Sequence, residues 1–438
     1  RYVRAAGNSA SHFELLLAQP KRLEILLGIF AASQFLADAL IHDPEFLNWV
    51  TASEVINGAR PRSVIESDLI AFTEGLNHTE WLNAVRRFRC REILRIGTRD
   101  ICLHAPIVEI TADLSALADA MVRAALEHYW RETGRDMQSA TASGPGSRPA
   151  GFCILAFGKL GGRELNYSSD IDLLGVYDAD QASAGKDHES VDSNLFYRAI
   201  GQVGNYLSAH TAEGHAYRVD FRLRPYGQAG QLAYSLPALA DYYRAKAALW
   251  EIQALLKARP IAGSEKLGRS FLDLVTAIIQ KRKGAREIIA SIEATRDANI
   301  IARPVDDEVV ADIKNGSGGI RDIEFLVQGL QLIHSPSIPE LINGNTTEAL
   351  TLLGAHDLMP RETAEQLKRD YEFLRRVEHC LQIFEDQQVH VLPDQDEERD
   401  ALAKRVFGFK ATADELLKEI KLCQARVQDC FRLYLTHR

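Results

Sequence analysis

Apolar residues recur with two different periods along this chain, and the change of period divides the sequence. From His12 to about Glu132 they return every three or four residues, which predicts amphipathic helices. Three short apolar runs follow between 152 and 224, and from about Ser235 the helical period continues to the end. This order predicts an α+β protein, predominantly helical, in which N-terminal helices and a C-terminal helical bundle enclose a small mixed sheet.

The three apolar runs predict three strands. Phe152–Phe157, "FCILAF", is apolar throughout, as in a buried strand. Residues 170–177, "DIDLLGVY", predict a second strand and residues 216–224, "AYRVDFRLR", a third. Strict alternation in the third strand places four polar residues on the face that we expect to meet a polar site: Arg218, Asp220, Arg222 and Arg224.

A change of composition predicts the domain boundaries. Residues from about 133 to 150 gather Gly, Ser, Thr, Pro and Ala without any period, which is typical of a linker. We expect an N-terminal helical segment at 1–135, a central core at 136–265 and a helical bundle at 266–438. Because the chain opens at Arg1 rather than Met, we also expect it to be a fragment of a longer chain.

Composition narrows the classes of partner. Charged residues make up 25% of the chain and the net charge is −9, so no global positive field gathers nucleic acid or anionic lipid. The six cysteines and thirteen histidines lack the spacing of metal or redox sites, so we expect reduced thiols and ordinary surface or core histidines. Without an apolar span or a signal peptide, the sequence predicts a cytoplasmic protein that binds neither membrane nor nucleic acid.

One arginine-rich stretch, "RRFRCREILRIGTR" at 86–99, is compatible with RNA binding. Aromatic residues for base stacking are sparse there, and the protein is acidic overall. We therefore expect solvated arginines that are interleaved with a stripe of core residues.

Two aspartates at the start of the second predicted strand are candidates for metal binding. Residues two apart on a strand point the same way, so Asp170 and Asp172 project together. If the third strand lies beside the second, Asp220 joins them, and three carboxylates form the oxygen-only set that suits Mg²⁺. Two carboxylates about 5 Å apart repel by about 3 kcal/mol at an effective dielectric near 20, so the cluster needs a compensating cation. The alternative is that arginines of the third strand compensate it as structural ion pairs.

A glycine-rich turn, "GKLGG" at 158–162, precedes these aspartates. Its spacing fits neither the P-loop pattern nor the dinucleotide-binding pattern GxGxxG. Glycines allow the backbone to approach a phosphate, and an ammonium or hydroxyl beside the carboxylates provides a hydrogen-bond donor. The candidate phosphate- or nucleotide-binding residues in this part of the chain are Gly158, Lys159, Gly161, Gly162, Ser168, Ser169 and Arg222.

"KNGSGG" at 314–319 is a second glycine loop, and an apolar-periodic helix follows it. A helix N-terminus preceded by glycines can hold an anion, and Lys314 and Arg321 add positive charge there. The alternative is an ordinary turn between helices in which Arg321 pairs with Glu324, three residues further on. Both interpretations stay open at this point.

Long strings around these residues resemble one known family. The strings "FGKLGGRELNYSSDIDLLGVYD", "YRVDFRLRPYG", "NGSGGIRDIEFLVQ" and "YEFLRRVEHCLQ" occur in the order found in the bifunctional glutamine synthetase adenylyltransferase/adenylyl-removing enzymes. These enzymes belong to the DNA polymerase beta-like nucleotidyltransferases. The resemblance runs through almost the whole chain, and it implies a nucleotidyltransferase core at 136–265 in which Asp170, Asp172 and Asp220 are the catalytic carboxylates and bind two Mg²⁺ ions.

The enzymes of this family carry two such units, and "ELNYSSDIDL" resembles the N-terminal, adenylyl-removing one. The implied reaction is phosphorolysis, in which phosphate attacks the AMP–tyrosine linkage on glutamine synthetase and ADP is released. Adenylylation of the same tyrosine from ATP and a non-catalytic regulatory module are the alternatives. The implied partners are adenylylated glutamine synthetase, the PII signalling protein, phosphate, ADP or ATP, and a second nucleotidyltransferase unit in a longer chain.

Overall fold

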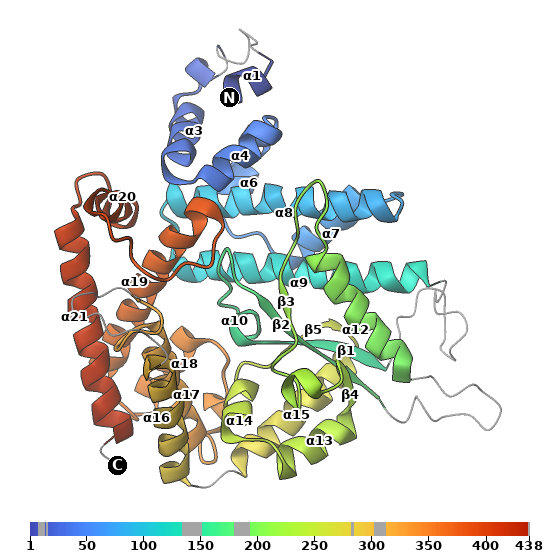
Figure 1. The fold of residues 1–438 in the computed structure, drawn as a ribbon, viewed down its shortest axis with the longest axis vertical. Helices are drawn as coiled ribbons and strands as arrows, with labels where there is room; N and C mark the ends of the chain where they lie inside the picture. Colours follow the sequence, from blue (N-terminus) through green and yellow to red (C-terminus); the bar gives the residue numbers. More distant parts are fainter. Residues whose placement is uncertain are drawn as a thin grey trace.

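The chain folds around one small sheet that helices cover on both faces (Figure 1). The computed structural model describes residues 1–7, 14, 16–133, 151–178, 193–281, 284–301 and 312–436. The predicted linker, apart from Thr133, lies outside these ranges. Helices dominate and the strands form one mixed sheet, so the predicted α+β fold is confirmed, whereas the division into three domains stays a prediction.

The sheet has the strand order β3-β2-β1-β5, and β4 also pairs with β2. β1 runs antiparallel to β2 and β5, whereas β3 and β4 run parallel to β2. The first two strands begin and end within one residue of the predicted bounds. The strands are β1 (Phe152–Phe157), β2 (Ile171–Tyr177), β3 (Val219–Asp220), β4 (Ala233–Ser235) and β5 (Arg259–Gly263).

The packing of β1 explains its continuous apolar sequence. Every second residue from Phe152 packs into a core formed with the N-terminal helices, and every second residue from Cys153 packs into a core formed with the C-terminal helices. All six side chains are buried. Because successive residues of a strand point to opposite faces, a sheet covered on both sides needs apolar side chains at each position.

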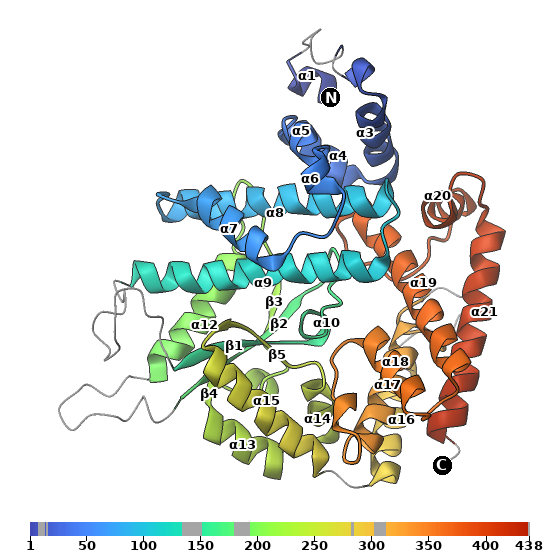
Figure 2. The same ribbon diagram turned by 180° about the vertical axis from the view of Figure 1, so that it is seen from behind.

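The helices form a layer on each side of the sheet (Figure 1, Figure 2). The helix that begins at His78 starts with a capping box, in which Asn77 and Glu80 exchange side-chain to backbone hydrogen bonds of 3.1 Å. The helices that pack on the sheet are α9 (Ile107–Glu132) and α12 (Ser193–Ser208) on one side, and α13 (Leu236–Ala245) and α15 (Glu265–Gln280) on the other, while α8 (His78–Ile101) packs on α9.

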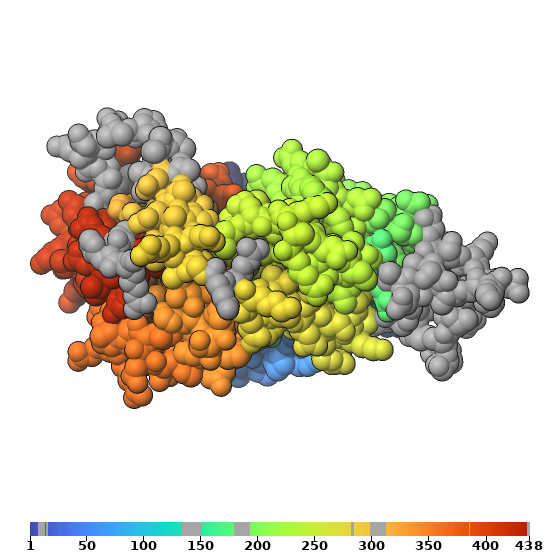
Figure 3. All heavy atoms as spheres, turned by 90° about the horizontal axis from the view of Figure 1, so that it is seen from below, coloured from blue at the N-terminus to red at the C-terminus, as the bar shows by residue number. Residues whose placement is uncertain are grey.

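Most of the remaining N-terminal helices stack on the far side of α8, and the last helices of the chain form a bundle beside the sheet (Figure 1, Figure 2). Within the described ranges no helix combines the length and apolar character that crossing a bilayer requires. Among the coloured residues seen from below, those of the green, yellow, orange and red part of the chain predominate, and blue N-terminal residues are visible only at the edge (Figure 3). The N-terminal helices are α1 (Tyr2–Ala5), α3 (Pro20–Ala32), α4 (Gln34–His42), α5 (Phe46–Val50), α6 (Ser53–Ile56) and α7 (Arg62–Thr73). The others are α10 (Gly158–Gly161), α14 (Leu249–Leu255), α16 (Ala285–Ile301), α17 (Ile320–His334), α18 (Thr346–Ala355), α19 (Arg361–Glu385), α20 (Asp396–Phe407) and α21 (Ala413–Phe431).

One predicted strand is too long, and β5 was not predicted as a strand. The third strand was expected over 216–224, but β3 comprises only Val219–Asp220. It ends there because the Asp220 carboxylate accepts a hydrogen bond of 2.7 Å from the backbone N–H of Arg222, which closes a turn instead of continuing the strand. β5 lies in the stretch predicted to be helical from about Ser235 onward.

The prediction of solvated arginines at 86–99 is also wrong. This stretch lies in α8, where the side chains of Arg95 and Arg99 are at most 4% exposed. Arg95 donates hydrogen bonds to Glu92 (2.8 Å) and to Asp113 of α9 (3.0 Å), and Arg99 donates to the same Asp113 oxygen (2.7 Å). Four arginines of this stretch are therefore buried (Arg86, Arg89, Arg95 and Arg99), whereas the Arg87 side chain is 43% exposed and pairs with Asp43 at 3.0 Å.

Candidate functional site

The structure brings the three predicted carboxylates together at one end of the two parallel strands β2 and β3. Asp172 on β2 is the register partner of Asp220 on β3, and Asp170 directly precedes β2. The charges of Asp220 and Asp170 both act on Asp172. The convergence that the strand argument predicts is therefore present.

Asp172 is the member of this cluster whose ionised form is disfavoured by its surroundings. Burial raises the pKa of its carboxyl group to about 7, and the neighbouring charges of Asp220 and Asp170 contribute to the shift. In the part of the chain that the structure describes, the Asp172 carboxylate has no hydrogen-bond or ion-pair partner. A cluster of oxygen ligands with uncompensated negative charge is chemically suited to a hard divalent cation such as Mg²⁺.

Two arginines pair with the outer members of the cluster, as the alternative interpretation predicts. Arg218 Nε lies 2.6 Å from Asp170 Oδ1, and Arg222 Nε lies 2.7 Å from Asp220 Oδ2. Burial favours the neutral form of Asp220, but hydrogen bonds from the Arg222 side chain and backbone outweigh it and lower the pKa of this carboxyl. The Arg218 and Arg222 side chains are 44% and 67% exposed, so solvent weakens both pairs.

Gly158 follows β1 and lies directly against Asp172. Its φ is +55°, and a Cβ atom at this position would lie 2.4 Å from Asp172 Oδ2, so the close approach requires glycine. The other two glycines of the turn contact protein backbone instead, since a Cβ would lie 1.7 Å from the Lys257 carbonyl oxygen at Gly161 and 2.6 Å from that of Gly344 at Gly162. Their contribution to phosphate binding stays a prediction.

Two of the predicted phosphate donors are engaged by the protein itself. Lys159 Nζ lies 3.1 Å from Glu378 Oε1 on α19, and Ser168 Oγ donates a hydrogen bond of 2.8 Å to the Asp386 carbonyl. Burial lowers the pKa of the Lys159 ammonium to about 7, although the fully buried Glu378 opposes the shift. Ser169 is half-buried beside Asp170. The Lys159–Glu378 pair joins the glycine turn to α19.

The second glycine loop reaches the same cluster. The charge of Lys314 opposes the rise in the pKa of Asp172 and is repelled by Lys159, so its ammonium is within electrostatic range of both. The loop is held by Asp312, whose Oδ1 accepts hydrogen bonds from the backbone N–H groups of Lys314 (2.9 Å) and Asn315 (2.7 Å). Among the residues that the structure places, the Lys314 ammonium makes no hydrogen bond or close ion pair, and its charge also helps to lower the pKa of the buried Glu378.

The end of this loop is fixed by Asp322 of α17. The Asp322 carboxylate accepts two hydrogen bonds of 2.8 Å from Arg296 and one of 2.7 Å from the backbone N–H of Gly318. Asp322 is buried, and its hydrogen bonds fix the shape of the loop. Arg321 lies nearby with its Cζ 6.0 Å from the centre of the Phe325 ring.

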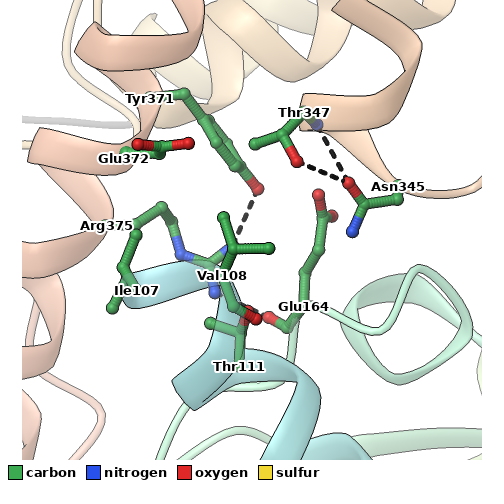
Figure 4. A pocket seen from close by; sticks show the side chains of 9 residues that line it. All are labelled: Ile107, Val108, Thr111, Glu164, Asn345, Thr347, Tyr371, Glu372 and Arg375. Carbon is green, nitrogen blue, oxygen red and sulfur yellow. Dashed lines mark hydrogen bonds between the residues drawn. The ribbon is translucent and has the colours of Figure 1, made fainter. Parts of the chain in front are cut away.

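Behind the site lies a buried ionic network that the sequence does not reveal. Lys257 Nζ contacts Glu164 (2.5 Å) and Glu324 (3.5 Å), so Glu324 has a cationic partner other than the predicted Arg321. Arg375 donates hydrogen bonds to the Glu164 carbonyl (2.6 Å) and to the Tyr371 hydroxyl (2.7 Å). A cavity of about 10 Å³, lined in part by Glu164, Tyr371 and Arg375, has room for one water and none for a nucleotide. Figure 4 shows the side chains that line it. The sequence offers one signal for this network: charged residues occur in α19 at positions that its helical period places in the core.

Comparison with known proteins agrees with these features. The family model "Glutamate-ammonia ligase adenylyltransferase" matches residues 23–274, and the model "GlnD PII-uridylyltransferase" matches residues 290–435. The chain is 35% identical to the "Bifunctional glutamine synthetase adenylyltransferase/adenylyl-removing enzyme" of Nitrosococcus oceani over 87% of this chain and 39% of that protein. It is 34% identical to the enzyme of the same name from Pseudomonas aeruginosa, over 93% and 41%. The chain thus spans about two fifths of the length of these relatives.

Proposed function

The chain belongs to the glutamate-ammonia ligase adenylyltransferase family, and we propose that it is a nucleotidyltransferase unit that removes AMP from a tyrosine of glutamine synthetase by phosphorolysis. The observation that carries the proposal is the register pairing of Asp172 with Asp220, with Asp170 beside them and the Asp172 charge only partly compensated by Arg222 and Lys314. The direction of the reaction rests on "ELNYSSDIDL", which resembles the adenylyl-removing unit of the family.

In the proposed reaction an oxygen of inorganic phosphate attacks the phosphorus of the tyrosine-linked AMP. A new phosphorus–oxygen bond forms, the bond to the tyrosine oxygen breaks, and that oxygen keeps the electron pair and takes up a proton. Divalent cations supply neutralisation of phosphoryl oxygens in such reactions. Asp170, Asp172 and Asp220 are the residues that would hold them, because they offer oxygen ligands at one strand edge.

Cationic side chains around the carboxylates are suited to binding the incoming phosphate. Lys314 lies on the Asp172 side of the cluster, and Arg222 is mostly exposed beside Asp220. Exposed ion pairs contribute only about 0–1 kcal/mol each, so Arg218 and Arg222 can leave their aspartates for a phosphate when a metal takes their place. Lys159 then acts by positioning the glycine turn through Glu378.

The proposed partners follow from the family and from the part of the chain matched. The relatives are named for glutamine synthetase, and residues 290–435 match a family named for PII, so we propose both proteins as partners. Adenylylation from ATP is the second candidate, because the names of the relatives include it. A second nucleotidyltransferase unit in a longer chain is proposed because the relatives are more than twice as long as the match.

The product of the reaction distinguishes these candidates. The chain is incubated with adenylylated glutamine synthetase, Mg²⁺ and labelled phosphate, and separately with unmodified synthetase and labelled ATP. We expect labelled ADP in the first mixture. Pyrophosphate and labelled synthetase in the second mixture, without ADP in the first, would establish the adenylylating direction instead, and turnover in neither would leave a regulatory module.

A further inference from the structure

A second group of metal-binding side chains lies where α8 begins and α9 ends, beside α12. His78 is the first residue of α8, whereas His128 and Glu132 are four residues apart on the last turns of α9 and so share one face of that helix. Figure 1 shows these two helix ends side by side next to α12, at the edge of the upper layer. The three ligand atoms all lie within 4.8 Å of one another.

The separations of the ligand atoms match those around a small tetrahedral ion. Glu132 Oε1 lies 2.7 Å from His78 Nδ1 and 3.2 Å from His128 Nε2, and the two ring nitrogens are 3.4 Å apart. Around an ion with bonds of about 2.0–2.1 Å, tetrahedral ligand atoms lie about 3.3 Å apart. Small shifts of exposed His78 and of Glu132 therefore suffice to bind such an ion.

Neighbouring aromatic residues orient two of the three ligands. Trp81 stacks on the His128 ring with 3.9 Å between ring centres and an interplanar angle of 6°. The Tyr206 hydroxyl of α12 donates a hydrogen bond to Glu132 Oε2, which leaves Oε1 directed at the histidines. Outer contacts of this kind fix the orientation of metal ligands.

The remaining side of the group is open. A hollow of about 410 Å³ lies beside it, lined by His78 and Glu132 on one side and by Gln202 and Asn205 of α12 on the other. We propose that His78, His128 and Glu132 bind one divalent transition-metal ion of the zinc class, with a fourth position open to this hollow. Two imidazoles and one carboxylate select zinc-like ions over Mg²⁺, so the ion differs in class from that proposed at the aspartate cluster.

Titration of the metal-free chain with Zn²⁺ and Co²⁺ tests this site. In excess Mg²⁺, which occupies the aspartate cluster, we expect one Zn²⁺ per chain by calorimetry and Co²⁺ absorption typical of a four-coordinate N/O site. His78→Asn and Glu132→Gln should abolish this binding, and Tyr206→Phe should weaken it by about 10–100-fold. Binding of no ion by the wild-type chain would overturn the proposal.

A matched control is available elsewhere in the chain. His356 Nε2 lies 3.1 Å from Glu340 Oε2. Among the described residues this histidine–carboxylate pair has no third potential metal ligand close enough to complete a site. His356→Asn should leave Zn²⁺ affinity unchanged. Equal affinities of His78→Asn, His356→Asn and the wild type would show adventitious binding only, provided that all three metal-free proteins unfold at the same temperature. The outcome is independent of the proposed reaction, because neither the nucleotide nor the aspartate cluster takes part.

Discussion

Two regions of the molecule combine arginines with aspartates, but they differ in how the charges are compensated. In the network between α8 and α9, the side chains of Arg95, Glu92 and Asp113 are at most 2% exposed, and each charge has an opposite charge within 3.0 Å. In the cluster at the end of β2 and β3, the arginines are about half exposed or more, and the central carboxylate of Asp172 has its pKa raised to about 7.

The difference separates a structural charge network from one prepared for a ligand. Removing one member of a balanced buried network leaves an uncompensated charge in a low dielectric, so such residues stabilise the fold they belong to. Three carboxylates with exposed partners leave negative charge that folding does not neutralise, which is the pattern expected where a cation binds. Residue type alone does not distinguish the two cases, whereas burial and charge balance do.

The largest effect should come from the unbalanced region. We expect Asp172→Asn to lower phosphorolytic ADP release on the order of 10⁴-fold, about 5 kcal/mol, because a ligand to the proposed cations is lost. Stability should not fall, since the neutral amide relieves repulsion by Asp170 and Asp220. ADP release and urea unfolding of the same preparation measure both. Full activity of the variant would remove the metal assignment.

The same substitution in the balanced region should have the opposite profile. Asp113→Asn leaves Arg95 and Arg99 without the carboxylate that both contact, and we expect a loss of about 3–5 kcal/mol in the free energy of unfolding. The folded fraction should keep its activity, because the network contacts no residue of the aspartate cluster that we describe. Urea unfolding at neutral pH measures the loss, with Asp172→Asn as the matched variant. An unfolding free energy within 1 kcal/mol of wild type would contradict the contrast.

The pH dependence of stability offers a smaller but more specific test. The pKa of Asp172 rises from an ordinary value of 3.8 to about 7 on folding, so the folded state binds the extra proton between these values. Stability should therefore decrease by about 2–4 kcal/mol as the pH rises from 4 to 7. Asp172→Asn should lack this component, and Mg²⁺ should reduce it by binding the ionised form. Urea unfolding midpoints from pH 4.5 to 8 are measured for the wild type with EDTA, the wild type with Mg²⁺ and Asp172→Asn with EDTA. Parallel plots of midpoint against pH for the variant and the wild type in EDTA would refute the raised pKa of Asp172.

The sequence predicts β1 and β2 well because they depend on local patterns, whereas Asp220 joins the cluster only through the pairing of β3 with β2. An apolar run identifies β1, and the spacing of Asp170 and Asp172 places both carboxylates on one side of the chain. The length of β3 could not be predicted, because it depends on one side-chain to backbone bond at Asp220. β5 was missed because it contains a proline and ends at a glycine, which are signals of a loop.

The burial of charged residues could not be predicted for a different reason. From sequence alone, arginine and lysine are expected to be solvated unless an acidic partner is close along the chain. Asp113, which accepts from Arg95 and Arg99, lies on another helix, and Glu378, which holds Lys159, is 219 residues away. His78 and His128 are likewise 50 residues apart, so their spacing resembles no metal motif. These groups become visible only when the packing of helices is known.

The smallest expected effect concerns Gly158, where the aspartate cluster meets the glycine turn. Gly158→Ala introduces a side chain at φ +55°, which costs about 1–2 kcal/mol, and places Cβ against Asp172 Oδ2. Gly75→Ala is the matched control, because its φ is +73° but no atom lies within 4 Å of the added Cβ. Both variants should lose similar stability, while Gly158→Ala alone should lose about tenfold in ADP release, because the Asp172 carboxylate has to rotate away. Unfolding curves and initial rates of the pair decide this, and equal rates would mean that the orientation of Asp172 does not matter for the reaction.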